Sequence, residues 1–389
     1  MQNQSYVTKQ PALLLKNGQP LLSQLDMELT ERCNNNCAHC CINLPAHDQT
    51  IKDQELSTVQ LKELLKEAVS LGCLKVRFSG GEPLLREDFE ELYIFSRKLG
   101  LRVLLYTNAT LITAHLAELF SRIPPLARIE VSVYGMKKSS YEAVTRTAGS
   151  FEAAWKGLNL LLEHKIPFVV KGAYLPPNKE EIGEFETWAA TVPSMDKTPA
   201  YAMFFDLRCR RDDRQRNDLI RKLRVTPEVG LKVITRNREK YLKNIRELCA
   251  KFMGPRGDTL FTCGSGRGDC VDAYGYFQRC LTLKHPDYVY DLKKGSLTDA
   301  LTNFAPKMKA IKAANPDYLR RCARCFLKGL CEQCPAKSWM EHGTLDTPVE
   351  YFCEVAHAQA RYVGLIDEHE KAWEVKDWKR RLSCISELA

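Results

Sequence analysis

The chain has 389 residues, of which 44% are hydrophobic and 27% charged, a composition typical of a globular protein of about two domains. It contains no run of about 18 apolar residues, and its N-terminus has no basic region followed by an apolar one. We therefore expect neither a membrane span nor a secretory signal, and we place the protein in the cytoplasm. The net charge is +9. The segment from Arg208 to Arg246 contains 14 Lys or Arg and 5 Asp or Glu, so its own net charge is also +9. This segment is either a solvated helical face or a surface that attracts an acidic partner.

The first two hundred residues alternate predicted strands with predicted helices. Apolar and polar residues alternate over residues 25–30, which predicts a strand, and a capping box at Ser57 and Gln60 predicts the helix that follows. Further strands are expected at residues 74–78, 101–106, 128–133, 167–174 and 200–206. Six strands separated by helices indicate parallel βαβ units, in an open sheet or a partial barrel.

The pattern changes after Asp206. Residues 208–250 are basic and mostly helical, and from Gly254 the chain is rich in Cys, Gly and Asp, which suits a small domain stabilised by metal. We expect an N-terminal extension (1–24), a barrel core (25–225), a basic helical bridge (226–257), a cysteine-rich domain (258–357) and a C-terminal helix (358–389).

Sixteen cysteines are unusual for a cytosolic chain, in which thiols stay reduced, and close-set groups of them indicate metal binding. The first group, which we call the cysteine loop, follows the first strand and consists of Cys33, Cys37 and Cys40. Three thiolates on a short loop can bind three irons of a cubane cluster and leave the fourth iron open to a small molecule. Zinc is the alternative, because a Cys3His set is common for zinc and His39 is adjacent.

The second strand ends in Gly80-Gly81-Glu82-Pro83, which we call the GGEP segment. Glycines let a ligand approach the backbone closely, Glu82 offers an anionic acceptor, and Pro83 ends the strand pairing. Since the cysteine loop and the GGEP segment follow consecutive strands, both are expected at the carboxyl edge of the sheet, where α/β folds bind ligands.

A second group of eight cysteines lies in the C-terminal third of the chain. Eight thiolates can hold two fully capped cubane clusters or two zinc ions. The cysteines are Cys263, Cys270, Cys280, Cys322, Cys325, Cys331, Cys334 and Cys353. Of the remaining five cysteines, Cys209 follows the sixth strand and is the one expected nearest the barrel mouth.

The cysteine loop and the GGEP segment resemble the CxxxCxxC and GGEP motifs of the radical S-adenosylmethionine (SAM) superfamily. The resemblance implies a partial (β/α)6 barrel and a 4Fe–4S cluster on the three loop cysteines, whose open iron chelates the methionyl amine and carboxylate of SAM. It implies that residues 80–83 bind this cofactor, with residues 80–82 receiving the amine. It also places His39 beside the adenine, where relatives often have an aromatic residue.

Three further positions resemble the superfamily more weakly. Asn108 lies in a Thr-Asn-Ala-Thr segment similar to the family's TNGT segment, with Ala109 in place of glycine. Ser132 at the end of the fourth strand and Arg146 before Gly149 stand where relatives contact the ribose or carboxylate of the cofactor. The alternatives are a turn hydroxyl for Ser132 and a surface ion pair for Arg146, and Lys171 is interpreted as an edge charge.

The C-terminal cysteines resemble the SPASM domain of radical peptide- and protein-modifying enzymes, except that two residues instead of three separate Cys331 and Cys334. The resemblance implies two auxiliary 4Fe–4S clusters, which makes three clusters in all. One would be held by Cys263, Cys270, Cys280 and Cys334. The other would be held by Cys322, Cys325, Cys331 and Cys353.

Together the resemblances imply an oxidoreductase that generates a 5′-deoxyadenosyl radical to oxidise or crosslink a ribosomally synthesised peptide or a protein side chain. Its electrons would come from a flavodoxin or ferredoxin. Because only 24 residues precede the barrel, we expect leader recognition to need a separate leader-binding protein or another surface of this chain. Sulfatase maturation is disfavoured, since those enzymes share an Asp after the second SPASM cysteine and here Leu281 follows Cys280.

Two alternatives remain open. Tetrapyrrole modification in a haem pathway is one, because arginines of the basic segment can pair with propionates. These are Arg208, Arg210, Arg211 and Arg214. A non-catalytic iron–sulfur electron carrier is the other, although the open-iron loop argues against it. No nucleic-acid partner is expected, because the basic segment lacks interleaved aromatic residues. The sequence identifies no catalytic acid or base.

Overall fold

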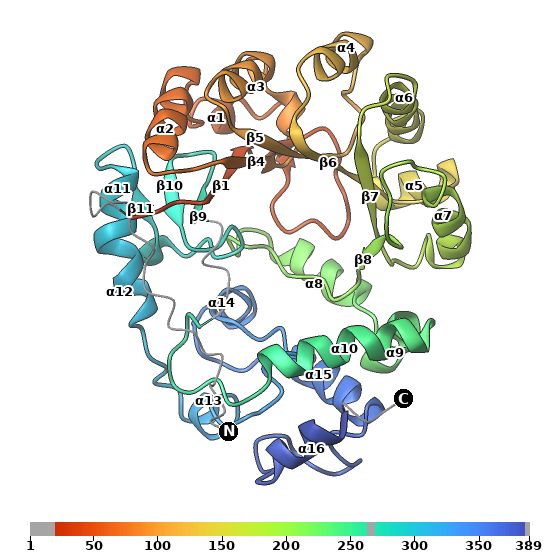
Figure 1. Cartoon of the computed structure of the whole chain (residues 1–389), viewed down its shortest axis with the longest axis vertical. Helices are drawn as coiled ribbons and strands as arrows, with labels where there is room; N and C mark the ends of the chain where they lie inside the picture. Colours follow the sequence, from red (N-terminus) through yellow and green to blue (C-terminus); the bar gives the residue numbers. More distant parts are fainter. Residues whose placement is uncertain (1–19, 263–268, 386–389) are drawn as a thin grey trace. The chain divides into compact units, whose positions relative to one another are not determined.

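The structure of the chain is a computed structural model that describes residues 20–262 and 269–385 (Figure 1). The chain divides into two compact units. Within the described residues, the barrel unit comprises residues 20–223 and 269–305, and the C-terminal unit comprises residues 224–262 and 306–385. Cys263 and residues 1–19 of the predicted N-terminal extension lie outside the described residues.

The barrel unit contains a nine-stranded sheet in the order β11-β10-β9-β1-β4-β5-β6-β7-β8. From β1 to β8 every neighbouring pair is parallel, which confirms the predicted α/β fold with a partial barrel. These six strands are β1 (Gln24–Thr30), β4 (Lys75–Gly80), β5 (Arg102–Thr107), β6 (Leu126–Val133), β7 (Phe168–Ala173) and β8 (Ala200–Ala202).

A hairpin that the sequence did not predict extends the sheet beyond β1. It consists of β9 (Asp269–Val271), β10 (Tyr276–Gln278) and β11 (Tyr290–Asp291). β9 pairs in parallel with β1 and antiparallel with β10, which is why this segment groups with the barrel. The domain boundaries expected from the sequence stay predictions.

Alternating residues give the sheet two different faces. Leu25, Met27 and Leu29 of β1 are buried in the hydrophobic core beneath the helices, whereas Asp26 and Glu28 lie on the opposite, inner face. Figure 1 shows the long helices of the barrel unit on the core side of the sheet. They are α2 (Thr58–Ser70), α3 (Phe89–Lys98), α4 (Ala114–Arg122), α5 (Lys138–Thr145), α6 (Ser150–Glu163) and α7 (Ile182–Ala189). The capping box predicted at Ser57 is confirmed at the start of α2.

Shorter elements complete the barrel unit. β2 (Arg32–Cys33) and β3 (Leu44–Pro45) form a two-stranded parallel sheet around the cysteine loop. The remaining helices are α1 (Gln49–Lys52), α8 (Arg214–Leu223) and α11 (Leu297–Asp299). Turns of 3-10 helix occupy Pro83–Leu85, Lys179–Glu181 and Pro286–Tyr288, and Ala300–Phe304 is π-helical.

The C-terminal unit is helical and has a smaller core of its own, built around Phe326, Leu327 and Ala356. Its helices are α9 (Pro227–Ile234), α10 (Arg238–Phe252), α13 (Pro316–Arg320), α14 (Pro335–His342), α15 (Glu350–Tyr362) and α16 (Trp378–Ile385), and α12 (Ala305–Lys309) begins at the junction of the units. The C-terminal helix expected at 358–389 is instead the end of α15 followed by α16, because Gly364 adopts a φ of 71° that stops the helix. Among the described residues, none of the helices has the length and apolar character that a membrane crossing needs.

Candidate active site

The cysteine loop lies at the carboxyl edge of the sheet and is fixed by the barrel itself. The Asn36 N–H donates to the Thr145 carbonyl at 2.9 Å, and the Ala38 N–H donates to the Val144 carbonyl at 3.0 Å. Both carbonyls belong to the last turn of α5. The loop conformation therefore rests on backbone hydrogen bonds that need no metal.

The three loop thiols are buried close to one another. Burial, together with negative charge on Glu82 and on Cys40, raises the pKa of the Cys33 thiol to about 12. Burial also raises the pKa of Cys37, and charge on Cys40 and Cys33 adds to the effect. Because thiolates so placed repel one another, a bound cation is needed to hold all three deprotonated.

Two polar groups of the loop have no hydrogen-bond partner although they are buried. They are the Asn35 side-chain amide and the His39 Nδ1 atom. Such orphaned groups are rare in native proteins and indicate a site for something bound. Burial lowers the pKa of His39 to about 4, so its ring is neutral, and it packs against Tyr134 at 5.3 Å and Phe205 at 5.0 Å between ring centroids. This surrounding fits a flat, polar aromatic ligand beside the loop.

The two glycines of the GGEP segment pack directly against the backbone of the residues that lead into the cysteine loop, where there is no room for a side chain. A Cβ atom on Gly80, whose φ is 136°, would lie 2.0 Å from the Thr30 carbonyl oxygen, and one on Gly81 would lie 2.2 Å from the Arg32 carbonyl oxygen. The Gly81 N–H donates to Thr30 at 2.7 Å. The structure thus gives these glycines a packing role that the sequence reasoning, which considered only ligand approach, did not foresee.

Glu82 is fully buried and directs its carboxylate toward the end of β5. One carboxylate oxygen accepts from the Thr107 hydroxyl at 2.8 Å, and the other accepts from the Asn108 N–H at 2.7 Å. Burial raises the pKa of Glu82 to about 7 despite these bonds. Glu82 therefore ties β4 to β5 directly beneath the cysteine loop, and Pro83 starts the 3-10 turn after it.

Asn108 connects the end of β5 to the cysteine loop. Its side-chain nitrogen donates to the Asn34 side-chain oxygen at 2.9 Å and lies 3.8 Å from the Cys33 sulfur. Ala109 next to it has a φ of 62°, a left-handed conformation that favours glycine, which is a physical reason for the glycine of the family segment. Asn108 is thus placed within reach of a ligand held by the loop.

The two weaker candidates are Ser132 and Arg146. Ser132 is on β6, on the inner face of the sheet, opposite Lys171 of β7. Arg146 is exposed, follows Thr145 and has a φ of 54°. Their predicted contacts with the cofactor stay predictions.

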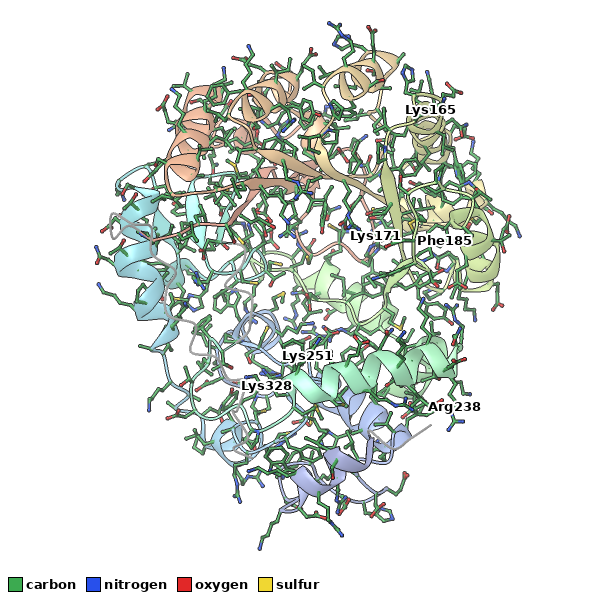
Figure 2. The ribbon with its side chains drawn as sticks, in the orientation of Figure 1. Lys165, Lys171, Phe185, Arg238, Lys251 and Lys328 are labelled. Atoms are coloured by element: carbon green, nitrogen blue, oxygen red, sulfur yellow. The ribbon has the colours of Figure 1, made fainter. Side chains whose placement is uncertain are left out.

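Charged residues that the sequence reasoning missed line the inner face of the sheet. Arg77 forms an ion pair with Asp26 and lies over the Tyr106 ring at 5.1 Å. The Lys171 Nζ lies 3.6 Å from the Tyr106 ring centroid and 3.6 Å from a Glu130 carboxylate oxygen (Figure 2). Lys171 is therefore an inner-face cation, and the period-two pattern of its strand was the signal that could have placed it there.

A second missed cluster surrounds Lys284, whose side chain is completely buried. Its ammonium group pairs with Glu28 and lies 3.1 Å from Glu31 and 3.9 Å from Asp272. Although burial alone lowers the pKa of Lys284, these three carboxylates raise it above its ordinary value. The cluster joins the end of β1 to the hairpin, which no local sequence pattern indicates.

The basic segment is partly committed to ion pairs inside the barrel unit. Arg208 is buried and bonds Asp212 through two of its three guanidinium nitrogens, each at 2.9 Å. Arg210 donates to Glu31 at 2.8 Å and to Asp272 at 3.2 Å. These two side chains are engaged with the protein's own carboxylates.

Cys209, singled out from the sequence, lies against the cysteine loop. Its N–H donates to the Cys41 carbonyl at 3.0 Å, and a hydrogen bond with the Cys41 thiol is the largest cause that raises the pKa of Cys209. The two cysteines therefore contact each other, and the structure gives them no role in the site described so far.

The hairpin carries two of the C-terminal cysteines. Cys270 lies on β9 opposite Asp26 of β1, and Cys280 follows β10. Burial raises the pKa of Cys270, and charges on Asp26 and Cys280 raise it further, so the two thiols are neighbours. We call this pair the hairpin site. Cys334, predicted to complete it, stands at the start of α14 in the other unit.

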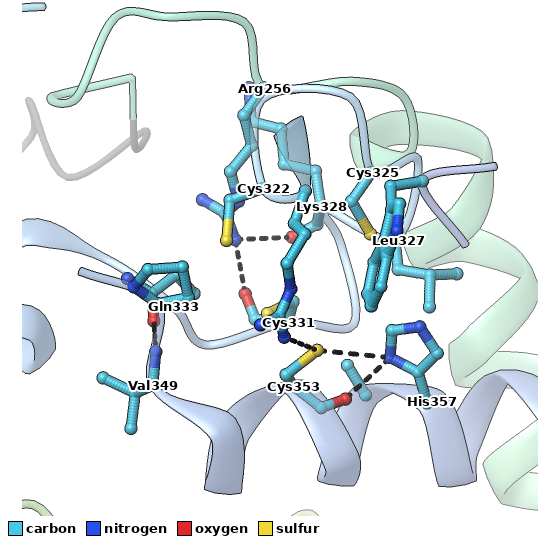
Figure 3. A pocket seen from close by; sticks show the side chains of 14 residues that line it. Arg256, Cys322, Cys325, Leu327, Lys328, Cys331, Gln333, Val349, Cys353 and His357 are labelled. Carbon is cyan, nitrogen blue, oxygen red and sulfur yellow. Dashed lines mark hydrogen bonds between the residues drawn. The ribbon is translucent and has the colours of Figure 1, made fainter. Parts of the chain in front are cut away.

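Four cysteines of the C-terminal unit line one cavity, which we call the quartet: Cys322, Cys325, Cys331 and Cys353. Figure 3 shows these side chains directed into the same space from the loop before α14 and from α15. Burial raises the pKa of Cys325 to about 12, with further contributions from charge on Cys331, Cys353 and Cys322. Four converging thiols match the ligand count of a fully capped cubane. Within residues 20–262 and 269–385, no three His, Cys, Asp or Glu side chains lie close enough to bind one single metal ion.

Residues 27–189 match the family model of the Radical SAM superfamily. The matched residues include the cysteine loop and the GGEP segment, so this part of the chain is similar to proteins of that superfamily.

Curated relatives resemble less than half of the chain. An AdoMet-dependent heme synthase from Methanosarcina barkeri is 33% identical over 178 residues, which is 46% of this chain and 49% of that protein. An Fe-coproporphyrin III synthase from the same organism is 33% identical over 159 residues, 41% of this chain and 38% of that protein. The chain thus spans less than half the length of these relatives.

Solved structures resemble nearly the whole chain in fold. anSMEcpe with bound AdoMet and the Kp18Cys peptide has a TM-score of 0.60 at 15% identity, covering 95% of this chain and 100% of that one. Streptococcus suis SuiB bound to S-adenosylmethionine has a TM-score of 0.51 at 16% identity, covering 81% of this chain and 73% of that one. The shared fold therefore extends over both units, whereas the two curated relatives are matched over less than half of the chain.

Proposed function

We propose that the chain uses SAM radical chemistry to oxidise or crosslink a side chain of a peptide or protein. The observation that carries this proposal is the pairing of an open three-cysteine loop with a separate cavity of four cysteines. The first arrangement leaves one metal position for a small molecule, and the second leaves none. Likeness in fold to anSMEcpe, which was solved with a peptide, supports the substrate class.

In this proposal the chain's own residues prepare the site. Cys33, Cys37 and Cys40 hold the 4Fe–4S cluster, and the neutral His39 ring and the unpartnered Asn35 amide bind the cofactor beside it. When bound, the cluster and SAM would supply one-electron cleavage of a carbon–sulfur bond of SAM, which gives a radical able to take a hydrogen atom from an unactivated carbon. Glu82 and Asn108 fix the loop against β5, and the barrel wall excludes water from the site.

The cysteines outside the loop would hold two auxiliary clusters, which would supply an acceptor for the electron that a substrate loses on oxidation. The quartet holds one of them. The hairpin site contributes Cys270 and Cys280 to the other. Full cysteine ligation favours electron transfer over substrate binding, because no iron is left open. A flavodoxin or ferredoxin supplies the first electron.

Tetrapyrrole modification is the second candidate, and the curated relatives named as heme synthases favour it. The contacts of the basic segment weaken it. Arg208 and Arg210, which were expected to pair with propionates, already pair with Asp212, Glu31 and Asp272. A free propionate would have to compete with carboxylates held by the fold.

The test is anaerobic reconstitution with iron and sulfide. We expect about twelve irons per chain, as three cubane sites require, and cleavage of SAM under dithionite. The Cys322→Ala variant should lose about four irons and keep SAM cleavage, but should not turn over the substrate. Tightly bound zinc without iron would refute the proposal. A short precursor peptide encoded beside this chain would favour the proposal and would be the substrate to test, and conversion of a porphyrin instead of a peptide would favour the second candidate.

A further inference from the structure

We propose that Arg321 raises the reduction potential of the cluster held by the quartet. This inference rests on the proposed function, because it needs a cluster at the quartet. It concerns a residue whose position the structure defines without the metal.

The quartet cavity is lined by positive charge. Its described lining residues include Arg256, Arg321 and Lys328 but no Asp or Glu, although Arg321 itself pairs with Asp317 and Glu350. The rest of the wall contains apolar side chains such as Leu327 and Trp373. In such a wall the effective dielectric constant is low, so a fixed charge acts on the cavity more strongly than it would in water.

Arg321 is the cation that reaches a ligand sulfur. Its guanidinium nitrogen lies 3.7 Å from the Cys353 sulfur, at the range of an N–H···S hydrogen bond. The guanidinium also bonds both oxygens of Glu350, at 2.6 and 2.8 Å, and lies 4.8 Å from the Trp373 ring centroid. These contacts hold the charge at the sulfur before any cluster is present.

A second N–H points at the same cysteine. The His357 Nδ1 atom lies 2.8 Å from the Cys353 carbonyl oxygen and 3.6 Å from its sulfur, as Figure 3 shows. Because the carbonyl can only accept, Nδ1 carries the proton, and the Nε2 atom accepts from the Ala372 N–H at 3.2 Å. Cys353 is therefore the ligand on which two donors converge.

Donors and a positive charge at a ligand sulfur stabilise the more negative state of a cluster. Reduction adds one electron to the cluster, and no bond forms or breaks. The negative charge that is added spreads onto the sulfurs, where Arg321 lies.

The test is a reductive titration followed by electron paramagnetic resonance. It uses the full-length reconstituted chain, and the same chain with Cys33, Cys37 and Cys40 changed to Ala so that only the auxiliary signals remain. In Arg321→Gln we expect one of the two auxiliary midpoints to fall so that the ratio of reduced to oxidised cluster drops about tenfold, which for one electron is about 59 mV. The other midpoint should not move.

Two variants separate this effect from a general disturbance. Arg324→Gln removes the same charge from an exposed position between Cys322 and Cys325 that does not line the cavity, and should leave both midpoints in place. Arg321→Lys keeps the charge but loses the planar donor, so its shift should be smaller than that of Arg321→Gln.

The outcomes distinguish the inference from the function on which it rests. If Cys322→Ala loses no iron and the auxiliary signals are absent, the proposed function fails. If both signals are present and the midpoints of Arg321→Gln equal those of the parent chain, the role of Arg321 is refuted and the function stands.

Discussion

The cysteine loop and the quartet place thiols in two different physical settings. The loop is bonded through its backbone to α5 and through Asn108 to the end of β5, so the barrel holds it. The quartet comes from an irregular segment and one helix of a unit without a sheet among its described residues, with a smaller core. The loop also leaves polar atoms unpartnered, whereas the quartet is surrounded by cations.

This difference shows how one chain can use the same ligand type for two purposes. A preformed loop with three thiols and a neutral aromatic neighbour is suited to bind a small molecule. A cavity with four thiols and fixed positive charge is suited to hold a closed cluster and stabilise an added electron. Where the fold is held by little else, the metal also contributes folding free energy.

The largest effect is expected from removing one ligand of the open site. Cys33→Ala should abolish SAM cleavage, because two thiolates do not hold the cluster with its open iron in place. The measurement is 5′-deoxyadenosine formed under dithionite in the absence of air. The matched Cys322→Ala variant should retain cleavage, and equal loss in both variants would contradict the division of labour between the two sites.

Removal of iron should destabilise the C-terminal unit and leave the barrel unit folded. After chelation under reducing conditions, we expect the amides of α13 and α15 to lose protection from hydrogen exchange, while the amides of β4, β5 and β6 keep it. Hydrogen exchange followed by mass spectrometry on the metal-loaded and metal-free chain measures this. Similar losses in both units would show that the barrel depends on metal as well.

The barrel unit should instead depend on its buried charges. Lys284→Met leaves Glu28, Glu31 and Asp272 buried with only Arg210 to offset them, and removal of one partner of a buried ion pair typically costs about 3–5 kcal/mol. Urea unfolding of the barrel, followed by aromatic fluorescence, measures the loss. The exposed Lys293→Met variant is the control and should change the unfolding free energy little. A Lys284→Met variant as stable as the parent would mean that the ion cluster is not what joins hairpin to barrel.

The sequence allowed prediction of the features that depend on local pattern. The six parallel strands, the capping box at Ser57 and the family of the cysteine loop all follow from short-range signals, and each is confirmed. What it missed depends on residues far apart in the chain. Lys284 pairs with Glu28, which is 256 residues away in the sequence. The pairing of β9 with β1 is likewise not indicated by any turn motif or residue spacing. Lys171 was interpreted as an edge charge although the period-two pattern of its strand could have placed it on the inner face, but its contacts with Tyr106 and Glu130 depend on the strand order.

The smallest effect concerns the pH dependence of the barrel and rests on Glu82. Its pKa is raised by burial from an ordinary 4.5 to about 7, so the folded chain binds this proton more tightly than the unfolded chain does. The resulting stabilisation is fully present below pH 4.5 and is lost as the pH rises through about 7. The difference between the two pKa values corresponds to at most about 3 kcal/mol. Glu82→Gln removes this titration.

Comparison of the parent chain with Glu82→Gln isolates this group, because Glu28, whose pKa burial also raises to about 7, titrates in both proteins. The unfolding free energy of the parent should fall relative to that of the variant between about pH 5.5 and 8, measured by urea unfolding of the barrel. The side-chain amide introduced by the substitution faces the Asn108 N–H, so a constant loss at all pH values is expected in addition and does not affect the slope. Parallel pH profiles would mean that Glu82 is already ionised at the acid end of this range, held so by the donors of Thr107, Asn108 and Leu84. In that case the hydrogen bonds, and not burial, would decide its charge beneath the cysteine loop.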